Sequence, residues 1–549
     1  MFQPSLTRRV GGRLLIPALK GRAKFNRRYA AQTELREQLT WRSGDIKMLT
    51  LRQTQWERLK STSFDVLILG GGISGACLFH HLSAAGYHVV IADKGDFASA
   101  TSQSSAMMIW GGLLYLKDLR FSTVWRLCGS RDLLVKDKAN WVRPQQFRYL
   151  VSHKGHRGGL LMSTALHGYW VMGKCKGARP RRSAVFPETG FLKSGTFANS
   201  FVYEEAVVDT SDSRFALRWI LEGQTENAVA LNYCAPLEAS FDETAGHWRL
   251  LMQGQLAKHL QSEVTARVIV NCTGPWTDQV NRQFGFDSPF KHVFSKGVFI
   301  GLPRLPDHKL PLIMDVGDAG DCMSLIPWGP ISLWGPTEAA NAELSDASSI
   351  EPADISYLLK ELNKFLKEPK SVADIISIRN GVRSLVVDKN AGANESTLSL
   401  SRKFEVYGDP DRPWISVYGG KLTGCVRLAR MATAKIRRLI GARPTPARRT
   451  IEQGRPEQTM YPGLSKAVPT LRWSVNRELC CTLDDYLRRR TNIAQWVPRG
   501  GLGRNNENRG YLTEISAELP DVGRGAPGDA VRMYESGMIH PVDSLIAAC

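Results

Sequence analysis

The sequence predicts an α/β fold in which a Rossmann-like dinucleotide-binding domain is interleaved with a mixed, β-rich substrate domain and followed by a C-terminal helical domain. Residues 64–93 show a strand, a glycine-rich turn, a helix and a second strand, the pattern that opens a dinucleotide-binding unit. A long middle region is rich in short strand-like runs. Two glycine turns, at 273–274 and 419–423, predict that the chain returns to the first domain, which implies interleaving.

The chain length sets the expected domain boundaries. A chain of 549 residues accommodates about two to four folding units. We expect a basic extension over residues 1–47, the interleaved domains over 62–440, and a helical domain with an irregular tail over 441–549. The extension carries eleven basic and three acidic residues, and its apolar run at 14–19 is too short and too interrupted by proline for a secretory signal. An organelle transit peptide, a disordered basic arm and translation from Met48 are the three interpretations.

Composition and charge indicate a globular protein with an anionic partner. With 43% hydrophobic and 23% charged residues, wholesale disorder is excluded. The net charge of +20 favours an anionic partner such as a phosphate, a lipid head group or a nucleic acid. Ten scattered cysteines without a CxxC pair predict a reducing compartment, no disulfide framework and no structural metal site.

One apolar segment bears on membrane association. No stretch reaches the about 18 consecutive apolar residues of a membrane span. Residues 160–173 come closest. A basic cluster follows them: Lys174, Lys176, Arg179, Arg181 and Arg182. The segment suits either a helix lying in a membrane interface or a packed core helix with a solvated, charged end.

The glycine-rich turn carries the signature of a dinucleotide site. The apolar run Phe64–Leu69 leads into a GxGxxG motif formed by Gly70, Gly72 and Gly75. The first glycine permits a tight turn, the second lets the backbone approach a pyrophosphate at the helix N-terminus, and the third allows close helix–strand packing. Asp93 ends the second strand, where its carboxylate can accept the ribose hydroxyls. A glycine-rich turn without a ligand is the alternative.

Two segments after the acid indicate the family. Gly95–Ser105 is rich in hydroxyl side chains, and Trp110–Leu116 follows it closely. These segments resemble those of the FAD-dependent, aerobic-type glycerol-3-phosphate dehydrogenases, which carry an Ala-Thr-Ser segment and then a Gly-Gly-Leu-x-Tyr-Leu segment. The resemblance implies that FAD is the cofactor and that Ser102, Ser104 and Gly112 bind it.

Further segments match this family in order along the chain, from about residue 64 to 496. They are Tyr203–Asp209, Val268–Trp276, Ile326–Trp328, Gly335–Glu338, Gly381–Arg383, Tyr418–Thr423 and Leu483–Thr491. The resemblance extends the expected FAD-binding set to Thr273, Gly274, Gly420, Lys421, Leu422 and Thr423. It also implies hydride transfer from a secondary alcohol, glycerol 3-phosphate or a related small molecule, to the flavin and then to a quinone-type acceptor.

Three side chains are candidate catalytic residues. The glycines before Leu422 place backbone N–H groups at a helix N-terminus, where they can stabilise negative charge on the reduced flavin, and Lys421 adds a fixed cation. Arg383 is a candidate fork for a substrate carboxylate or phosphate. Tyr115 is the candidate base for the hydroxyl proton. For each cation, a structural ion pair is the alternative.

The chain departs from the family at four polar positions of the substrate shell, which here are Met107, Trp110, Leu114 and Phe299. Each lost charged partner of a buried phosphate costs about 1.5–3 kcal/mol. Two hypotheses follow. Either Arg379 or Lys296 replaces the lost phosphate ligands, or the enzyme oxidises a different secondary alcohol, hydroxy acid or amine.

Partners and location follow from the resemblance and the charge. A quinone acceptor, the basic surface and residues 160–173 predict a cytoplasmic protein, at the inner face of a membrane where it associates peripherally. A basic cluster at 435–449 either contributes to this membrane association or is an exposed linker. A nucleic-acid-binding flavoprotein or inactive scaffold is the competing class. Because eight of the +20 charges lie in 1–47 and no nucleic-acid motif occurs, we expect no nucleic-acid partner.

Overall fold

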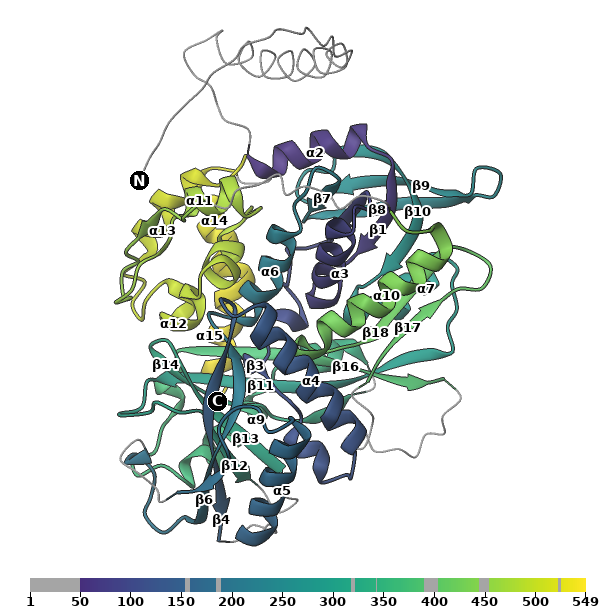
Figure 1. Ribbon diagram of the computed structural model, residues 1–549. Helices are drawn as coiled ribbons and strands as arrows, with labels where there is room; N and C mark the ends of the chain where they lie inside the picture. The colour runs from purple at the N-terminus through teal and green to yellow at the C-terminus, as the bar shows by residue number, and fades with distance from the viewer. Residues whose placement is uncertain are drawn as a thin grey trace, which may run out of the picture. The chain divides into compact units, whose positions relative to one another are not determined.

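The fold is described from a computed structural model (Figure 1). The structure describes residues 50–153, 158–183, 189–316, 321–341, 343–389, 403–443, 454–521 and 525–549. The predicted extension over 1–47 lies outside the described residues, as do Arg448 and Arg449 of the basic cluster. The predicted domain boundaries stay predictions.

A largely parallel sheet carries the dinucleotide motif. Eight strands are described in it: β1 (Phe64–Leu69), β2 (Val89–Ala92), β7 (Ala228–Leu231), β8 (Cys234–Asp242), β9 (His247–Gly254), β10 (Gln261–Asn271), β17 (Phe404–Gly408) and β18 (Trp414–Gly419). The strands β18, β10, β1, β2 and β7 run parallel in that order, with β1 fully buried near the centre. Because the carboxyl ends of parallel strands meet at one edge, β1, β2, β10 and β18 all deliver their following turns to the same place.

Both faces of this sheet are covered, as a continuous apolar β1 run predicts. Val66 and Ile68 pack on one face into the core beneath α3 (Ile73–Ala84), α6 (Asp212–Glu222) and α10 (Cys425–Ile440). Leu67 and Leu69 alternate to the opposite core. Elements of that second core are α2 (Leu51–Ser61), β8, β9 and α7 (Thr277–Gln283). Figure 1 shows α3, α6 and α10 grouped beside β1.

A second, mostly antiparallel sheet forms the predicted substrate domain. Ten strands are described in it: β3 (Met108–Ile109), β4 (Val142–Ser152), β5 (Arg181–Arg182), β6 (Phe197–Val208), β11 (Phe290–Pro303), β12 (Leu312–Val316), β13 (Asp321–Trp328), β14 (Ile331–Gly335), β15 (Ala339–Asn341) and β16 (Ser377–Asp388). The chain supplies β1–β2 to the first sheet, β3–β6 to the second, β7–β10 to the first, β11–β16 to the second and β17–β18 to the first. The predicted interleaved α/β fold is confirmed.

Helices flank the second sheet. They are α4 (Phe121–Asp137), α5 (Gly159–Met172), α8 (Leu344–Ser348) and α9 (Pro352–Asn363). The apolar segment predicted at 160–173 is therefore a helix. It buries Met162, Leu166 and Tyr169, yet Leu160 and Leu161 of the same helix are 84% and 63% exposed. Across the parts of the chain that are described, no helix combines the length and apolar character needed to cross a membrane.

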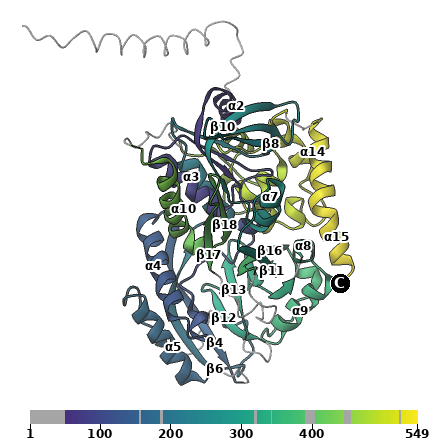
Figure 2. The same cartoon turned by 90° about the vertical axis from the view of Figure 1, so that its right-hand side faces the viewer.

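The C-terminal region is helical, as predicted (Figure 2). It contains a short β19–β20 pair (Gln458–Thr459 and Val468–Pro469), α11 (Leu471–Arg477), a π-helical turn over Asp485–Arg490, α12 (Ile493–Trp496), α13 (Arg509–Ile515), α14 (Pro527–Tyr534) and α15 (His540–Ala547). The tail after Pro498 is more helical than expected, because Leu512, Val531 and Ile539 enter a common apolar core despite the many Asn and Gly residues around them. The vicinal Cys480 and Cys481 lie between helices and are buried.

Candidate functional site

The turn after β1 forms a cradle that only glycine permits. Gly70 has a φ of +98°, and a Cβ there would lie 2.5 Å from the carbonyl oxygen of Cys272. Gly75 lies in the first turn of α3, where a Cβ would lie 2.0 Å from the carbonyl oxygen of Gly70. The first glycine therefore makes the turn and the third brings the helix against the strand. Between them, Gly72, Ile73 and Ser74 line a cavity.

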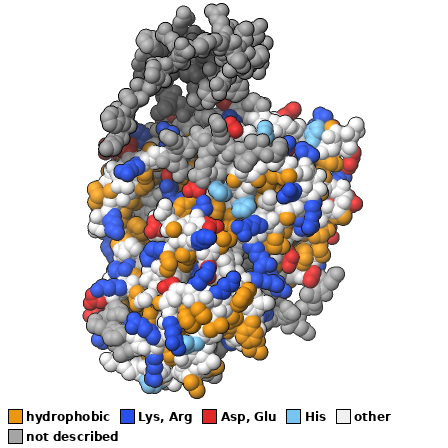
Figure 3. Space-filling model, viewed as in Figure 1, with side chains coloured by type: hydrophobic (Ala, Val, Ile, Leu, Met, Phe, Trp, Pro, Cys, Tyr) orange, Lys and Arg blue, Asp and Glu red, His pale blue; other side chains and the backbone are white. Residues whose placement is uncertain are grey.

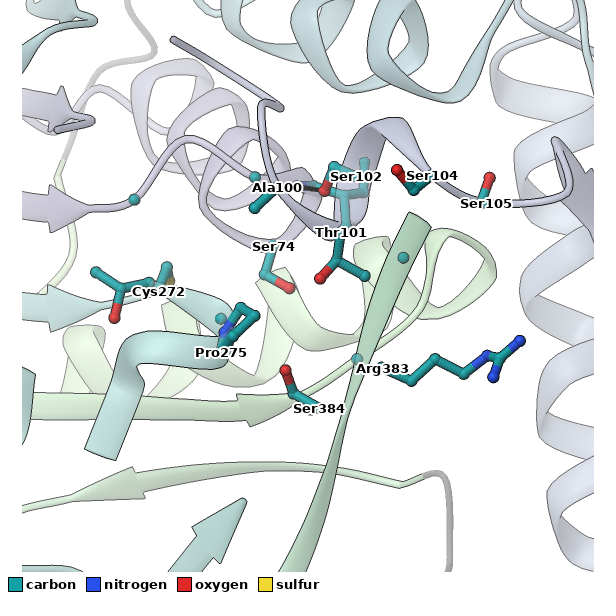
Figure 4. A pocket seen from close by; sticks show the side chains of 18 of the residues that line it. Ser74, Ala100, Thr101, Ser102, Ser104, Ser105, Cys272, Pro275, Arg383 and Ser384 are labelled. Carbon is teal, nitrogen blue, oxygen red and sulfur yellow. Dashed lines mark hydrogen bonds between the residues drawn. The ribbon is translucent and has the colours of Figure 1, made fainter. Parts of the chain in front are cut away.

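At the N-terminus of α3, a free backbone N–H group finds its hydrogen-bond acceptor outside the helix. Gly72, its N-cap residue, offers no side chain. Instead the Ile73 N–H donates to Ser102 Oγ at 2.9 Å. The hydroxyl-rich segment thus packs on the helix N-terminus, while Ser74 adds a hydroxyl at the next position (Figure 4). The remaining N–H groups and the helix dipole favour an anion such as a pyrophosphate.

Asp93 closes the cradle at the end of β2. Its Oδ2 accepts from the Gly71 N–H at 2.6 Å and its Oδ1 accepts from the Gly95 N–H at 2.9 Å. Burial raises the pKa of Asp93 to about 6, against the lowering effect of those two N–H groups. A half-buried carboxylate that lines a cavity is well placed to accept hydroxyl donors.

One cavity of about 970 Å³ joins these elements to the second sheet. Most of the sequence-predicted site residues line it: Gly70, Gly72, Asp93, Ser102, Ser104, Tyr115, Thr273, Gly274, Arg383, Gly420, Lys421, Leu422 and Thr423. Gly75 and Gly112 are not lining residues. Gly112, with φ of +88°, lies under the wall, where a Cβ would meet the Tyr115 ring at 2.8 Å.

The cavity brings together two of the segments that carried the family resemblance, Trp110–Leu116 and Tyr418–Thr423. The Trp110 N–H donates to Thr423 Oγ1 at 3.0 Å, and that hydroxyl donates back to the Trp110 carbonyl at 3.2 Å. Lys421 Nζ donates to the Tyr115 hydroxyl and lies 4.3 Å from the centre of its ring. A cation and a phenol therefore occupy one position on the wall.

Arg383 reaches the cavity from β16 (Figure 4). Its Nη1 donates to Ser295 Oγ at 3.1 Å. Gly297 leaves room for the guanidinium, because a Cβ there would lie 2.6 Å from Arg383 Nη2. Neighbouring groups thus hold the guanidinium at the cavity wall, as recognition of a carboxylate or phosphate requires.

The departures from the family pattern separate into two groups. Trp110, Leu114 and Phe299 line the cavity, so three apolar side chains do face the space where a substrate would lie. Met107 does not line it. Met107 is 3% exposed, and Arg379 Nη1 lies 3.1 Å from its sulfur. This departure from the family pattern therefore lies in the packing behind the cavity wall and does not change the wall itself.

The two proposed replacements for the phosphate ligands are wrong. Arg379 is buried and donates to Asp212 Oδ2 at 2.8 Å. Lys296 is also buried and pairs with Asp354 of α9 at 2.8 Å. Neither lines the cavity. Each cation neutralises a nearby carboxylate, because a buried charge needs a partner, and neither is placed to hold a substrate phosphate.

Sequence reasoning missed several lining residues. Among them are Ser74, Lys94, Gln253, Gln255, Trp276, Ser324 and Glu338. Ser74 occupies a variable position of the glycine motif, so the motif itself would have found it. The β8–β9 residues reach the cavity because the Tyr233 N–H donates to the Gly95 carbonyl at 2.8 Å, a register that the sequence does not reveal.

The fold and cavity define a two-domain, dinucleotide-dependent oxidoreductase, with the cofactor at the carboxyl edge of a parallel sheet and a second sheet closing over it. The profile of the FAD dependent oxidoreductase family matches residues 65–424. The chain belongs to this family, and FAD is its cofactor. The residues present fit FAD, because Gly72 and Ser74 line the cavity at the N-terminus of α3 and Asp93 supplies a half-buried acceptor beside them.

Similar proteins are named glycerol-3-phosphate dehydrogenases. The chain is 27% identical over 379 residues to one from Pseudomonas tolaasii, covering 68% of this chain and 71% of that protein. It is 28% identical over 378 residues to the aerobic enzyme of Escherichia coli K12, covering 68% and 73%. The structure is similar to that of the Bacillus halodurans glycerol-3-phosphate dehydrogenase complexed with FAD, with a TM-score of 0.65, 16% identity, and 90% and 99% of the chains covered. The chain is thus an FAD-dependent oxidoreductase related to glycerol-3-phosphate dehydrogenases.

Proposed function

We propose that the chain oxidises a small anionic secondary alcohol, glycerol 3-phosphate or a related compound. The observation that supports this most directly is the convergence of Arg383, Lys421 and Tyr115 on the cavity that holds the dinucleotide motif. Two cations and a phenol that line one cavity suit a substrate with an anionic end and a hydroxyl group. The names of the relatives at 27% and 28% identity agree with this substrate class.

The chain's residues would divide the reaction between them. Bound FAD supplies the acceptor for the hydride that leaves the carbon next to the hydroxyl group. Arg383 binds the anionic end and thereby orients that carbon. Tyr115, ionised beside the Lys421 ammonium that contacts its oxygen, would accept the hydroxyl proton and become a neutral phenol. The apolar side chains on the wall keep water away from the reacting atoms.

A hydroxy acid or an amine is the second candidate substrate class. A specific observation favours it: Trp110, Leu114 and Phe299 line the cavity, while Arg379 and Lys296 are held by carboxylates elsewhere. A carboxylate carries less charge than a phosphate and needs fewer cations. An apolar wall also suits a substrate side chain better than it suits a phosphate.

Anaerobic bleaching of the flavin absorbance tests both candidates. The holoenzyme is mixed with glycerol 3-phosphate, glycerol, small 2-hydroxy acids and amino acids in separate cells. Bleaching by glycerol 3-phosphate, lost in Arg383→Gln, supports the first candidate. Bleaching only by a hydroxy acid or an amino acid supports the second. Bleaching by dithionite alone would contradict both, because dithionite needs no substrate site.

We also propose that this enzyme docks on an anionic membrane through α4, α5 and the turn before α4. Leu119, Phe121 and Trp125 are 71%, 55% and 52% exposed, and Leu160 and Leu161 are more than half exposed as well. Exposed basic residues follow α5: Lys174, Lys176, Arg179, Arg181 and Arg182. Figure 3 shows hydrophobic side chains between Lys and Arg side chains on the lower half of this face, where Figure 1 places α4 and α5. Apolar side chains beside basic ones suit an interface with anionic lipid.

Vesicle flotation tests the docking. Leu160→Ser combined with Leu161→Ser should reduce partitioning onto phosphatidylserine-containing vesicles at least tenfold, because tenfold requires only about 1.4 kcal/mol and full burial of one leucine contributes about 1.5–3 kcal/mol. Met533→Ser is the matched control, since Met533 is 60% exposed on α14. Equal partitioning of both variants would contradict the assignment of the surface. Reoxidation of the reduced enzyme by a short-chain ubiquinone tests the proposed quinone acceptor.

A further inference from the structure

We infer that His292 is a positioning residue that holds Gly419 and so places Gly420 and Lys421 against the flavin. The Gly419 N–H donates to His292 Nε2 at 3.0 Å. His292 belongs to β11 of the second sheet, and its side chain is fully buried. Gly419 ends β18 of the first sheet. This hydrogen bond therefore joins the two sheets at the edge of the cofactor cavity.

The segment that His292 holds is one that needs outside support. Gly419 and Gly420 have φ angles of +64° and +113°, both in the region that favours glycine. Glycine reaches such conformations without strain, but it also reaches many others. Gly419 does not line the wall with a side chain, so its position is set by backbone contacts. His292 Nε2, an acceptor at a fixed place on β11, favours the one backbone conformation of Gly419 in which its N–H can reach the ring.

His292 is itself fixed by its surroundings. His292 Nε2 accepts the Gly419 N–H, and Nδ1 on the other side of the ring lies 3.5 Å from Asp278 Oδ2. The same carboxylate oxygen accepts the His292 backbone N–H at 2.9 Å. The Tyr418 ring packs against the imidazole, with the ring centres 5.1 Å apart. The chain Asp278–His292–Gly419 thus runs from α7 through β11 to the cofactor segment.

The consequence for the cofactor follows from electrostatics. The inference rests on the proposed function only in that it uses the same FAD site, whose cavity Gly420 and Lys421 line. A reduced flavin carries more negative charge than an oxidised one, and donors placed beforehand stabilise that charge more than donors that must move. Without the His292 acceptor, the segment loses its fixed position. The reduction potential of the bound FAD should then fall, whichever substrate the enzyme uses.

Two amide variants separate positioning from simple loss of the histidine. In His292→Gln the amide oxygen reaches about the place of Nε2, whereas in His292→Asn it is one methylene too short. The midpoint potential of each FAD-loaded enzyme is measured by equilibration with a reference dye, together with the FAD content and the melting temperature. We expect His292→Asn to shift the two-electron equilibrium at least tenfold toward oxidised flavin, about 30 mV. His292→Gln should keep a value close to that of the unaltered protein.

The outcomes are distinguishable from those of the proposed function. Loss of FAD from the Asn variant alone also supports the positioning role, since only the reach of the amide differs. Equal potentials for the Gln and Asn variants, or equal loss of FAD from both, would overturn it. None of these readouts uses a substrate. An enzyme inactive with every alcohol and amine tested would therefore refute the proposed function and leave this experiment unaffected.

Discussion

Arg490 and Asp96, which are 394 residues apart, form a two-pronged ion pair with both side chains fully buried. Arg490 Nη1 donates to Asp96 Oδ2 at 2.5 Å and Nη2 donates to Oδ1 at 2.8 Å. Arg489 Nε donates to the same carboxylate at 2.5 Å. Asp96 lies three residues after Asp93. The C-terminal helical region is therefore tied directly to the loop that carries the acid of the cofactor site.

Replacing Asp96 by Asn should destabilise the protein strongly. Breaking one partner of a buried ion pair costs about 3–5 kcal/mol, because it leaves an uncompensated charge. The free energy of unfolding, measured in urea, should fall by that amount. Asp484→Asn is the matched control, because Asp484 also pairs with Arg489 but is 26% exposed, and it should cost less than about 1 kcal/mol. Similar losses in both variants would contradict a special role for Asp96.

The same pair predicts a loss of stability in acid. Burial alone would raise the pKa of Asp96, but Arg490 and Arg489 outweigh it and hold that pKa well below its usual range. A carboxyl with a lowered pKa stabilises the fold above its unfolded pKa of about 3.9, and this contribution is lost as the pH falls further. The unfolding free energy of the unaltered protein should therefore decrease below about pH 4 more steeply than that of Asp96→Asn.

Local patterns in the sequence predicted the cofactor cradle, but not the partners of buried charges. The glycine motif and Asp93 lie within one strand–turn–helix–strand unit, so their arrangement follows from residues close together in the sequence. The buried partner of Arg489 and Arg490 could not be predicted from their own segment, because Asp96 is distant in the sequence. Arg379 and Lys296 were misassigned for the same reason. The sequence pattern around a basic residue in a strand is the same whether its side chain binds a substrate or a carboxylate of the protein. For Arg379, only the structure shows that the side chain pairs with Asp212.

Binding of FAD should depend on pH through Asp93. Burial raises the pKa of Asp93 to about 6 in the protein without cofactor. Ribose hydroxyls would donate to the ionised carboxylate, so binding favours the charged form and releases a proton when the pH is below that pKa. The affinity for FAD should fall by up to tenfold per pH unit below about pH 6. Titration of the apoprotein with FAD, followed by flavin fluorescence, measures this.

The Asp93→Asn variant is the control for that dependence. Its affinity for FAD should be lower at pH 7 and nearly constant between pH 5 and 7, because the amide does not titrate. An unaltered slope in Asp93→Asn would assign the proton to another group.

Gly75→Ala should break the packing of α3 on β1. The added Cβ would lie 2.0 Å from the backbone carbonyl oxygen of Gly70, so the helix or the turn must move. We expect a loss of FAD binding and at least about 2 kcal/mol of stability, similar to other overpacked sites. Gly168→Ala is the matched control, since Gly168 lies inside α5 with open space around it. There alanine should be neutral or stabilise by up to about 1 kcal/mol.

Leu114→Arg tests whether the apolar wall determines the substrate. Leu114 lines the cavity one residue before Tyr115 and is one of the four departures from the polar pattern of the family that it resembles. It is partly buried, so a longer side chain has an outlet. A hydrogen bond to a charged group contributes about 1.5–3 kcal/mol. A guanidinium at this position should therefore raise kcat/KM for glycerol 3-phosphate tenfold or more. Leu114→Met, which adds length without charge, should not. If Leu114→Arg instead lowers kcat/KM for glycerol 3-phosphate while the unaltered enzyme already uses it well, the phosphate is held elsewhere on the wall, and Leu114 does not exclude it.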